Sequence, residues 1–279
     1  MRDALDSLSG RRIVLIGGKG GVGKTTISSL AALQFARSRP VILFTTDPAS
    51  NLTDLFTEAV DNLTIESVDA SRLYARFLEE NLPSFLEIAD RGTYLDREEL
   101  RRFFELSLPG VDELMSWMRI GELAESHPDS MVVVDTAPTG HALRMIGAAE
   151  HFRQLANALD AMEEKHRGMV RQFMRRDVRD AMDEFIESFE ATASRRREML
   201  RDPALSAFVP VFLSEPWVVE QTLRLIGEVR EEGIDVPFAV LNRAIVEVDC
   251  ALCEVRKQRD DSARQRLAPL PVVPFERSC

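Results

Sequence analysis

The sequence predicts an α/β fold: a mostly parallel, doubly wound sheet with an inserted α-helical subdomain. The first observation is a series of short runs, rich in Val and Ile and apolar at nearly every position, which is typical of strands buried on both faces of a parallel sheet. The second is that amphipathic helical stretches separate these runs, as the crossover helices of βαβ units do. The third is that two of the separating stretches are much longer than a crossover helix requires.

The expected strands can be placed by their residues. The strongest are residues 12–17, 41–47, 131–135, 208–215, 238–244 and 271–275. Residues 63–70 are more polar and are expected at an edge of the sheet. The two long stretches, about residues 72–128 and 150–203, show only helical or irregular patterns. We therefore expect a single domain over residues 1–279, with a helical subdomain formed by both stretches.

Composition and charge exclude several classes of protein. Asp and Glu number 46 against 35 Lys and Arg, a formal net charge of −11. A sequence-independent nucleic-acid binder needs a basic surface, so no nucleic-acid partner is expected. The first residues lack the apolar core of a signal peptide, and no stretch approaches the ~20 apolar residues of a membrane-spanning helix. With only three cysteines we expect a cytoplasmic protein that reaches a membrane only through a partner.

A phosphate-binding loop follows the first expected strand. Residues 18–25, GKGGVGKT, match the pattern G-x-x-x-x-G-K-[ST] and open a helical stretch, which is the context that supports the motif. Lys24 is expected to reach the β- and γ-phosphate oxygens, and the Thr25 hydroxyl to contact Mg²⁺. The residues expected to hold the nucleotide are Gly18, Lys19, Gly20, Gly21, Val22, Gly23, Lys24, Thr25 and Thr26. The sequence therefore predicts ATP or GTP binding.

Two carboxylates end expected strands, at the edge of an open α/β sheet where ligands bind. Asp135 ends the strand at 131–135 and is suited to the Mg²⁺-water position, whereas Asp47 ends the strand at 41–47 and is suited to polarising an attacking water. The alternative for either residue is an ordinary helix N-cap or turn former.

Lys19 is a second lysine, placed at the start of the loop. A cation there does not easily fold back on its own nucleotide, but it can reach a facing copy of the chain. Hydrolysis builds negative charge on the transferred phosphoryl group, and a cation supplied by another chain stabilises that charge as an arginine finger does. Lys19 therefore predicts a homodimer with nucleotides at its interface.

Several motifs together resemble one family of ATPases. They are KGGVGKTT (19–26), TDPASNL (46–52), LPGVDELMSW (108–117), DTAPTGHALRMI (135–146), LNRA (241–244) and CALCEVRK (250–257). With these motifs the chain resembles the arsenite-pump ATPases and the ATPases that target tail-anchored membrane proteins, which share a deviant phosphate loop. The resemblance implies a phosphate-loop fold and a slow, Mg-ATP-dependent homodimer that switches between open and closed forms.

At the phosphate end, the resemblance implies the same roles that the residue types and their positions indicate. Lys19 would be the inter-subunit lysine, Asp47 the water-positioning carboxylate, and Asp135 the residue near Mg²⁺. One departure is Ser50, where the family often has His.

At the base end, the resemblance implies that Asn242 reads the adenine edge and that Pro274 and Phe275 flank the base in a C-terminal loop. Glu215 would lie near the ribose of the partner's nucleotide. The departure here is Arg243, where the family often has Gln.

Cys250 and Cys253 form a CxxC pair, with no histidine near them in the sequence. Structural zinc takes four ligands, so two thiols from each copy of a homodimer would complete a site, and the resemblance implies such a zinc. The alternatives are a redox pair or two ordinary buried thiols.

Three functions are compatible with such an ATPase. In the first, the helical subdomains of a closed homodimer form an apolar groove for a membrane-protein helix, as in tail-anchored-protein targeting. The groove would be lined by adaptable methionines, although their spacing also fits an ordinary helix-to-helix core. These are Met162, Met169, Met174 and Met182.

The second function is the soluble catalytic subunit of an arsenite or antimonite efflux pump, with a membrane pump subunit as partner. The sequence has one phosphate loop, and its thiols, Cys250, Cys253 and Cys279, all lie in the C-terminal part, which makes stimulation by arsenite less expected. The third is a positioning ATPase like the septum-site and plasmid-partition proteins. Those usually show a basic surface or a C-terminal amphipathic helix, which we do not expect here.

Overall fold

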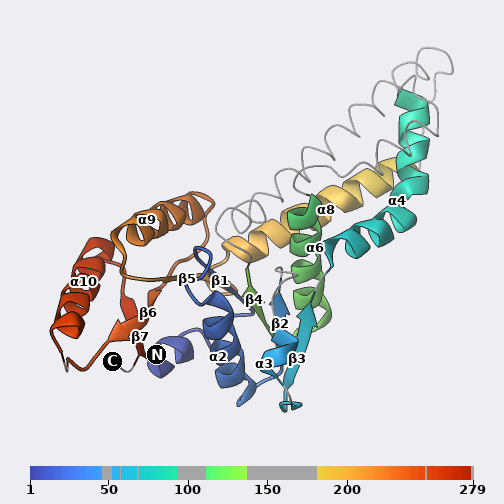
Figure 1. Cartoon of the computed structure of the whole chain (residues 1–279). Helices are drawn as coiled ribbons and strands as arrows, with labels where there is room; N and C mark the ends of the chain where they lie inside the picture. Colours follow the sequence, from blue (N-terminus) through green and yellow to red (C-terminus); the bar gives the residue numbers. More distant parts are fainter. Residues whose placement is uncertain are drawn as a thin grey trace. The chain divides into compact units, whose positions relative to one another are not determined.

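The computed structural model describes residues 1–45, 52–56, 58–67, 69–92, 111–136, 181–248 and 250–277. The chain divides into two compact units. The first comprises Met1–Val68, Arg119–Ile146 and Met199–Cys279, and the second Asp69–Met118 and Gly147–Glu198. Figure 1 shows the elements of both units along the chain.

The first unit contains a seven-stranded sheet in the order β3-β2-β4-β1-β5-β6-β7, in which every pair of neighbouring strands is parallel. The strands are β1 (Ile13–Gly17), β2 (Val41–Thr45), β3 (Leu63–Ser67), β4 (Met131–Asp135), β5 (Ser206–Phe212), β6 (Ala239–Ile245) and β7 (Val272–Arg277). The predicted α/β class with a mostly parallel sheet is thereby confirmed. The expected edge strand at 63–70 is β3, which does lie at an edge.

The core of the first unit lies along the central strands. Every residue of β1, β2, β4 and β5 is buried, whereas β3 has only half-buried and exposed positions. This difference explains why the central runs read as continuously apolar in the sequence and the edge run does not. β1 pairs with β4 on one side and β5 on the other, so the loop after β1 lies between the carboxyl ends of those two strands.

Helices cover both faces of this sheet. α1 (Arg2–Asp6), α2 (Lys24–Ala36) and the short α3 (Leu52–Leu55) belong to the N-terminal part, and α9 (Pro216–Glu231) and α10 (Ala251–Leu267) to the C-terminal part. The chain moves from β1 towards β3 in one direction and from β5 to β7 in the other. Because such crossovers are right-handed, α2 and α9 cover opposite faces, as Figure 1 shows.

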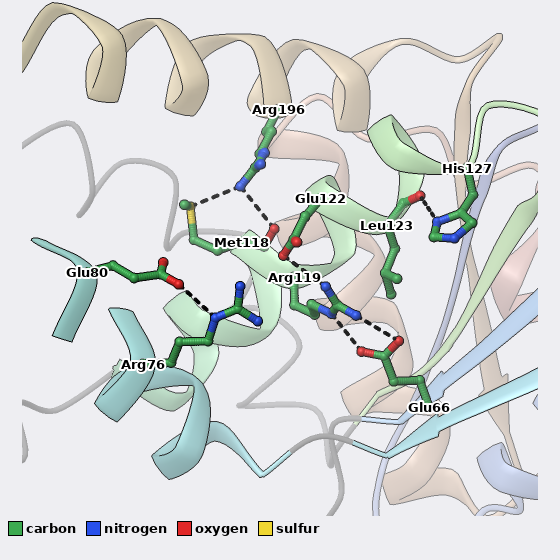
Figure 2. A network of polar contacts seen from close by, with 9 residues as sticks. All are labelled: Glu66, Arg76, Glu80, Met118, Arg119, Glu122, Leu123, His127 and Arg196. Atoms are coloured by element: carbon green, nitrogen blue, oxygen red, sulfur yellow. Dashed lines mark hydrogen bonds and ion pairs between the residues drawn. The ribbon is translucent and has the colours of Figure 1, made fainter. Parts of the chain in front are cut away.

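α6 (Val111–Ser126) crosses the division between the units, which falls after Met118. Its later turns belong to the sheet unit. There Arg119 forms a bidentate ion pair with Glu66 of β3, with Nε–Oε1 and Nη2–Oε2 distances of 2.6 and 3.1 Å (Figure 2). Arg119 Nη1 also lies 3.0 Å from Glu122. The hydrogen bond to Glu66 raises the pKa of the Arg119 guanidinium. The first segment of the second unit ends at Met118, and the helical subdomain over about 72–128 and 150–203 stays a prediction.

The second unit is helical where it is described. It contains α4 (Ala70–Gly92), the beginning of α6 and most of α8 (Ala181–Arg201). Arg196 of α8 donates to the Met118 carbonyl oxygen at 3.0 Å, and Arg76 pairs with Glu80 along α4 (Figure 2). None of the described helices combines the length and the apolar character that a membrane crossing requires.

The last strand corrects one expectation. Pro274 and Phe275 lie within β7, paired with Leu241 and Asn242 of β6, and not in a C-terminal loop. β7 is the edge strand of the sheet, where a proline is tolerated because its missing N–H is not needed by a further strand.

Candidate nucleotide site

The loop after β1 has a backbone that requires glycine at two points. Gly18 has φ 151°, and a Cβ there would lie 2.2 Å from the Val211 carbonyl oxygen of β5. Gly23 has φ 92°, and a Cβ there would lie 2.2 Å from the Asn242 amide nitrogen. Both glycines therefore allow the loop to approach neighbouring strands more closely than any side chain would permit.

The start of α2 is arranged for an anion. Gly23 is its N-cap and supplies no side-chain hydrogen bond, so the first backbone N–H groups of the helix are not capped by it. Lys24, the first residue of the helix, is buried, and its ammonium group donates to the Lys19 carbonyl oxygen at 3.2 Å. Uncapped N–H groups, the positive end of the helix and a lysine held over the loop together suit a phosphate group.

The side of the loop that faces β4 carries the two residues predicted to lie near Mg²⁺. Thr25 Oγ1 donates to Asp135 Oδ2 at 2.7 Å, and Asp135 is 1% exposed at the end of β4. Adjacent oxygen ligands of octahedral Mg²⁺ lie about 2.9 Å apart, given Mg–O distances near 2.0–2.1 Å, so this hydroxyl–carboxylate pair fits the ion. Thr136 fixes the end of β4, because its hydroxyl donates to the Ile16 carbonyl oxygen of β1 at 2.9 Å.

Lys19 lies on the opposite flank of the loop. Its ammonium nitrogen is 3.2 Å from the centroid of the Trp217 ring, at the start of α9. The ring is 54% exposed. The two lysines of the loop thus differ in direction: Lys24 turns into the loop, and Lys19 turns outward to α9.

Asn242 connects β6 to the loop. Its amide nitrogen donates to the Val22 carbonyl oxygen at 2.7 Å, and its amide oxygen accepts from the Arg243 backbone N–H at 2.8 Å. Arg243 adopts φ 57° at an irregularity between β6 and β7. The predicted base-reading amide is therefore also a structural link, although one N–H and one lone pair of the amide are not used in these two bonds.

A cavity of about 230 Å³ opens at the carboxyl ends of β5 and β6, beside Asn242 and Glu215. Arg243 and two arginines of α10, Arg256 and Arg259, also line it. No ion pair joins these three guanidinium groups to any described residue, so their charges are available to an anionic ligand. Glu215 Oε2 is buried and accepts no hydrogen bond from the described part of the chain, which leaves an acceptor for a hydroxyl or amine donor. Pro274 and Phe275 do not line this cavity.

Comparison with known proteins agrees with this geometry. A family model described as anion-transporting ATPase matches residues 11–270, nearly the whole chain. The chain belongs to this family. It is an ATPase of about 30% identity to several curated members. An "ATPase ASNA1 homolog" from Dictyostelium discoideum is 30% identical over 268 residues, 92% of this chain and 80% of that protein. An "ATPase GET3" from Rhodotorula glutinis is 30% identical over 251 residues, which are 87% of this chain and 74% of that protein.

Some predicted site residues of this ATPase lie outside the described residues. They include Asp47, and with it the water-positioning role, and Ser50. The backbone of Met182 lies in α8, but its side chain and the residues Met162, Met169 and Met174 lie outside the described part.

The cysteine pair of the ATPase lies at the start of α10. Cys250 is the helix N-cap, and its sulfur accepts from the Cys253 backbone N–H at 3.4 Å. The two sulfur atoms are 3.4 Å apart. Two sulfur ligands of tetrahedral zinc lie about 3.8 Å apart for Zn–S bonds near 2.3 Å, so the two sulfur atoms here are closer together than zinc ligands would be. Among the described residues no group of three or more His, Cys, Asp or Glu side chains could hold a metal ion.

Sequence reasoning missed two features of this site. Trp217 was not predicted, although an aromatic residue directly after Glu215 and Pro216, at the end of an expected strand, was a visible signal. The arginines of α10 were also missed, because their i, i+3 spacing does not show what that side of a polar helix faces.

Proposed function

We propose that this ATPase works as a homodimer that binds Mg-ATP, alternates between open and closed forms, and shields or delivers an apolar helix of a membrane protein. ATP hydrolysis follows from the family. The dimer, the metal and the client are the proposal.

The observation that carries the dimer is the direction of Lys19. Lys24 already lies over the phosphate loop, while the Lys19 ammonium group lies on an exposed ring at the start of α9. A lysine held on that flank is suited to the phosphates of a facing copy, where it would stabilise the charge that develops in hydrolysis.

The choice of client follows from chemistry on the other unit. The resemblance to ATPases of tail-anchored-protein targeting favours an apolar helix as client. Neither segment of the helical unit contains a cysteine in the sequence, so that unit offers no thiolate to a metalloid. A soft metalloid would have to use Cys250, Cys253 or Cys279, which all belong to the sheet unit.

Mixing two inactive variants tests the dimer. Lys19→Met keeps its own phosphate site but gives up the transferable cation, whereas Lys24→Met keeps Lys19 but disables its own site. We expect each alone to be inactive and an equal mixture to recover about a quarter of the wild-type rate, because half of the C2 dimers are mixed and each has one complete site. An inactive mixture, with mixed dimers shown by pull-down of a tagged variant, would refute action between chains.

Two further measurements separate the clients. Co-expression with a tagged apolar helix should give a complex with the wild-type chain that ATP binding changes. Arsenite should leave the ATPase rate unchanged; stimulation that is lost in Cys250→Ser would instead support the pump subunit. Zinc analysis of the purified dimer should give one ion per two chains, and Cys250→Ser should release it.

A further inference from the structure

The contact between Lys19 and Trp217 joins residues that are distant in the sequence. Trp217 is the second residue of α9, which begins at Pro216 after β5, and β5 pairs with β1 directly before the phosphate loop. The sheet thus brings the ring to the first turn of the loop. At 3.2 Å from the ring centroid, the ammonium nitrogen is well inside the ~6 Å range of a cation–π interaction, for which Trp is the best ring.

Packing does not account for the position of this tryptophan. The next two residues of α9, Val218 and Val219, are 2% and 1% exposed and anchor the helix, whereas Trp217 is 54% exposed. A large aromatic side chain left half in solvent contributes little to the core. Its ring instead contacts the ammonium group of Lys19.

We propose that Trp217 is a positioning residue for Lys19: its ring holds the lysine on its own chain until a nucleotide phosphate comes within reach. The inference rests on the proposed role of Lys19 between chains. An exposed cation–π contact changes an equilibrium by about 2- to 5-fold, which is enough to localise the lysine but too weak to compete with a triphosphate carrying several negative charges.

The contact between Lys19 and Trp217 has two consequences for the reaction. It keeps Lys19 away from the loop while Lys24 occupies the position over the phosphate site, so the two ammonium groups do not compete there. It also opposes dimer closure by the free energy of the ring contact. Removing the ring should therefore favour the closed form and raise the specific ATPase rate at low protein concentration by about 2- to 5-fold.

Fluorine NMR of the full chain labelled with 5-fluorotryptophan tests the contact between Lys19 and Trp217 directly. The sequence contains two tryptophans, and the buried Trp117 serves as an internal reference. Trp217→Leu, which keeps apolar bulk without the ring, assigns the second resonance. We expect Lys19→Met to shift the Trp217 resonance in the nucleotide-free chain. A non-hydrolysable ATP analogue with Mg²⁺ should shift the wild-type resonance in the same direction and have a much smaller effect in Lys19→Met.

The kinetic readout uses conservative variants. Trp217→Leu should raise the rate at low protein concentration, and Trp217→Phe, with a weaker ring, should give an intermediate rate. The proposal is overturned if Lys19→Met leaves the Trp217 resonance in place, if the nucleotide does not move it, or if Trp217→Leu lowers the rate as Lys19→Met does. The shift of the Trp217 resonance in the nucleotide-free Lys19→Met chain does not depend on dimer formation. If that shift is present and the mixing experiment fails, the proposed action between chains is refuted and the contact between Lys19 and Trp217 is not.

Discussion

Asn242 provides the sharpest test of how the base end of the site is built. A residue that only reads the base would affect nucleotide affinity and leave the free chain unchanged. In the structure its amide instead holds the phosphate loop to β6, through the Val22 carbonyl oxygen and the Arg243 backbone N–H. We therefore predict that Asn242→Ala destabilises the chain in the absence of nucleotide.

The magnitude follows from the two bonds. Each contributes about 1 kcal/mol net, and a buried carbonyl left without a partner costs about 1–3 kcal/mol. Val22 is 1% and Asn242 8% exposed, so water does not easily replace the lost amide. The expected loss is about 2–4 kcal/mol in the free energy of unfolding, or a fall of about 5–15 °C in Tm for a chain of this size.

Thermal unfolding of the nucleotide-free chain, followed by circular dichroism, measures this loss. Arg243→Ala is the matched control: it is the next residue of β6, its side chain bonds to no described residue, and alanine has the same difficulty as arginine at φ 57°. That variant should unfold within about 0.5 kcal/mol of wild type. An Asn242→Ala chain with an unchanged Tm and weakened ATP binding would show that the link to the loop carries no stability and would refute the reasoning.

Three other predictions address the loop and the helix beside β3. Gly18→Ala should abolish ATP binding in calorimetry with the circular dichroism spectrum retained, because its Cβ would lie 2.2 Å from the Val211 carbonyl oxygen. Thr25→Val should bind ATP as the wild type does in EDTA and lose the gain in affinity that Mg²⁺ provides. Arg119→Met should lower the free energy of unfolding by about 1.5–3 kcal/mol, the range for hydrogen bonds to charged groups. The hydrogen bond to Glu66 raises the pKa of Arg119 in the folded chain. The stability that Arg119 contributes is therefore complete below the unfolded pKa and is lost only in strong alkali. The difference in the free energy of unfolding between Arg119→Met and wild type, measured by urea titration, should stay constant from about pH 6 to about pH 9.

The sequence was sufficient to predict the parallel sheet because its central strands are buried on both faces and therefore read as continuous apolar runs. The edges were harder. β3 was visible only as a weaker run. For β7 the apolar run at 271–275 predicted a strand, whereas the resemblance placed Pro274 and Phe275 in a C-terminal loop, and the structure agrees with the run.

The residues of the candidate site also differ in how far they could be predicted from local sequence patterns. The candidate phosphate loop and the role proposed for Thr25 could be inferred from the sequence, because the pattern that marks them lies within a few residues. The contacts of Lys19 with Trp217 and of Val22 with Asn242 depend on which strands are neighbours of β1 and of β6, and strand order is not written in the spacing of any single motif. Long-range side-chain contacts of this kind required the structure.

Because the strand order is β4-β1-β5, the two sides of the loop after β1 contact different kinds of side chain. β4 brings Asp135 to Thr25 on one side, and β5, through α9, brings Trp217 to Lys19 on the other. Substitutions on the β4 side should therefore change the dependence on Mg²⁺ and leave the dependence on protein concentration intact, while substitutions on the β5 side should do the reverse. ATPase rates measured on a grid of Mg²⁺ and protein concentration for Thr25→Val and Trp217→Leu would separate the two. If both variants changed both dependences equally, the loop would act as one unit and the division of roles between its lysines would fail.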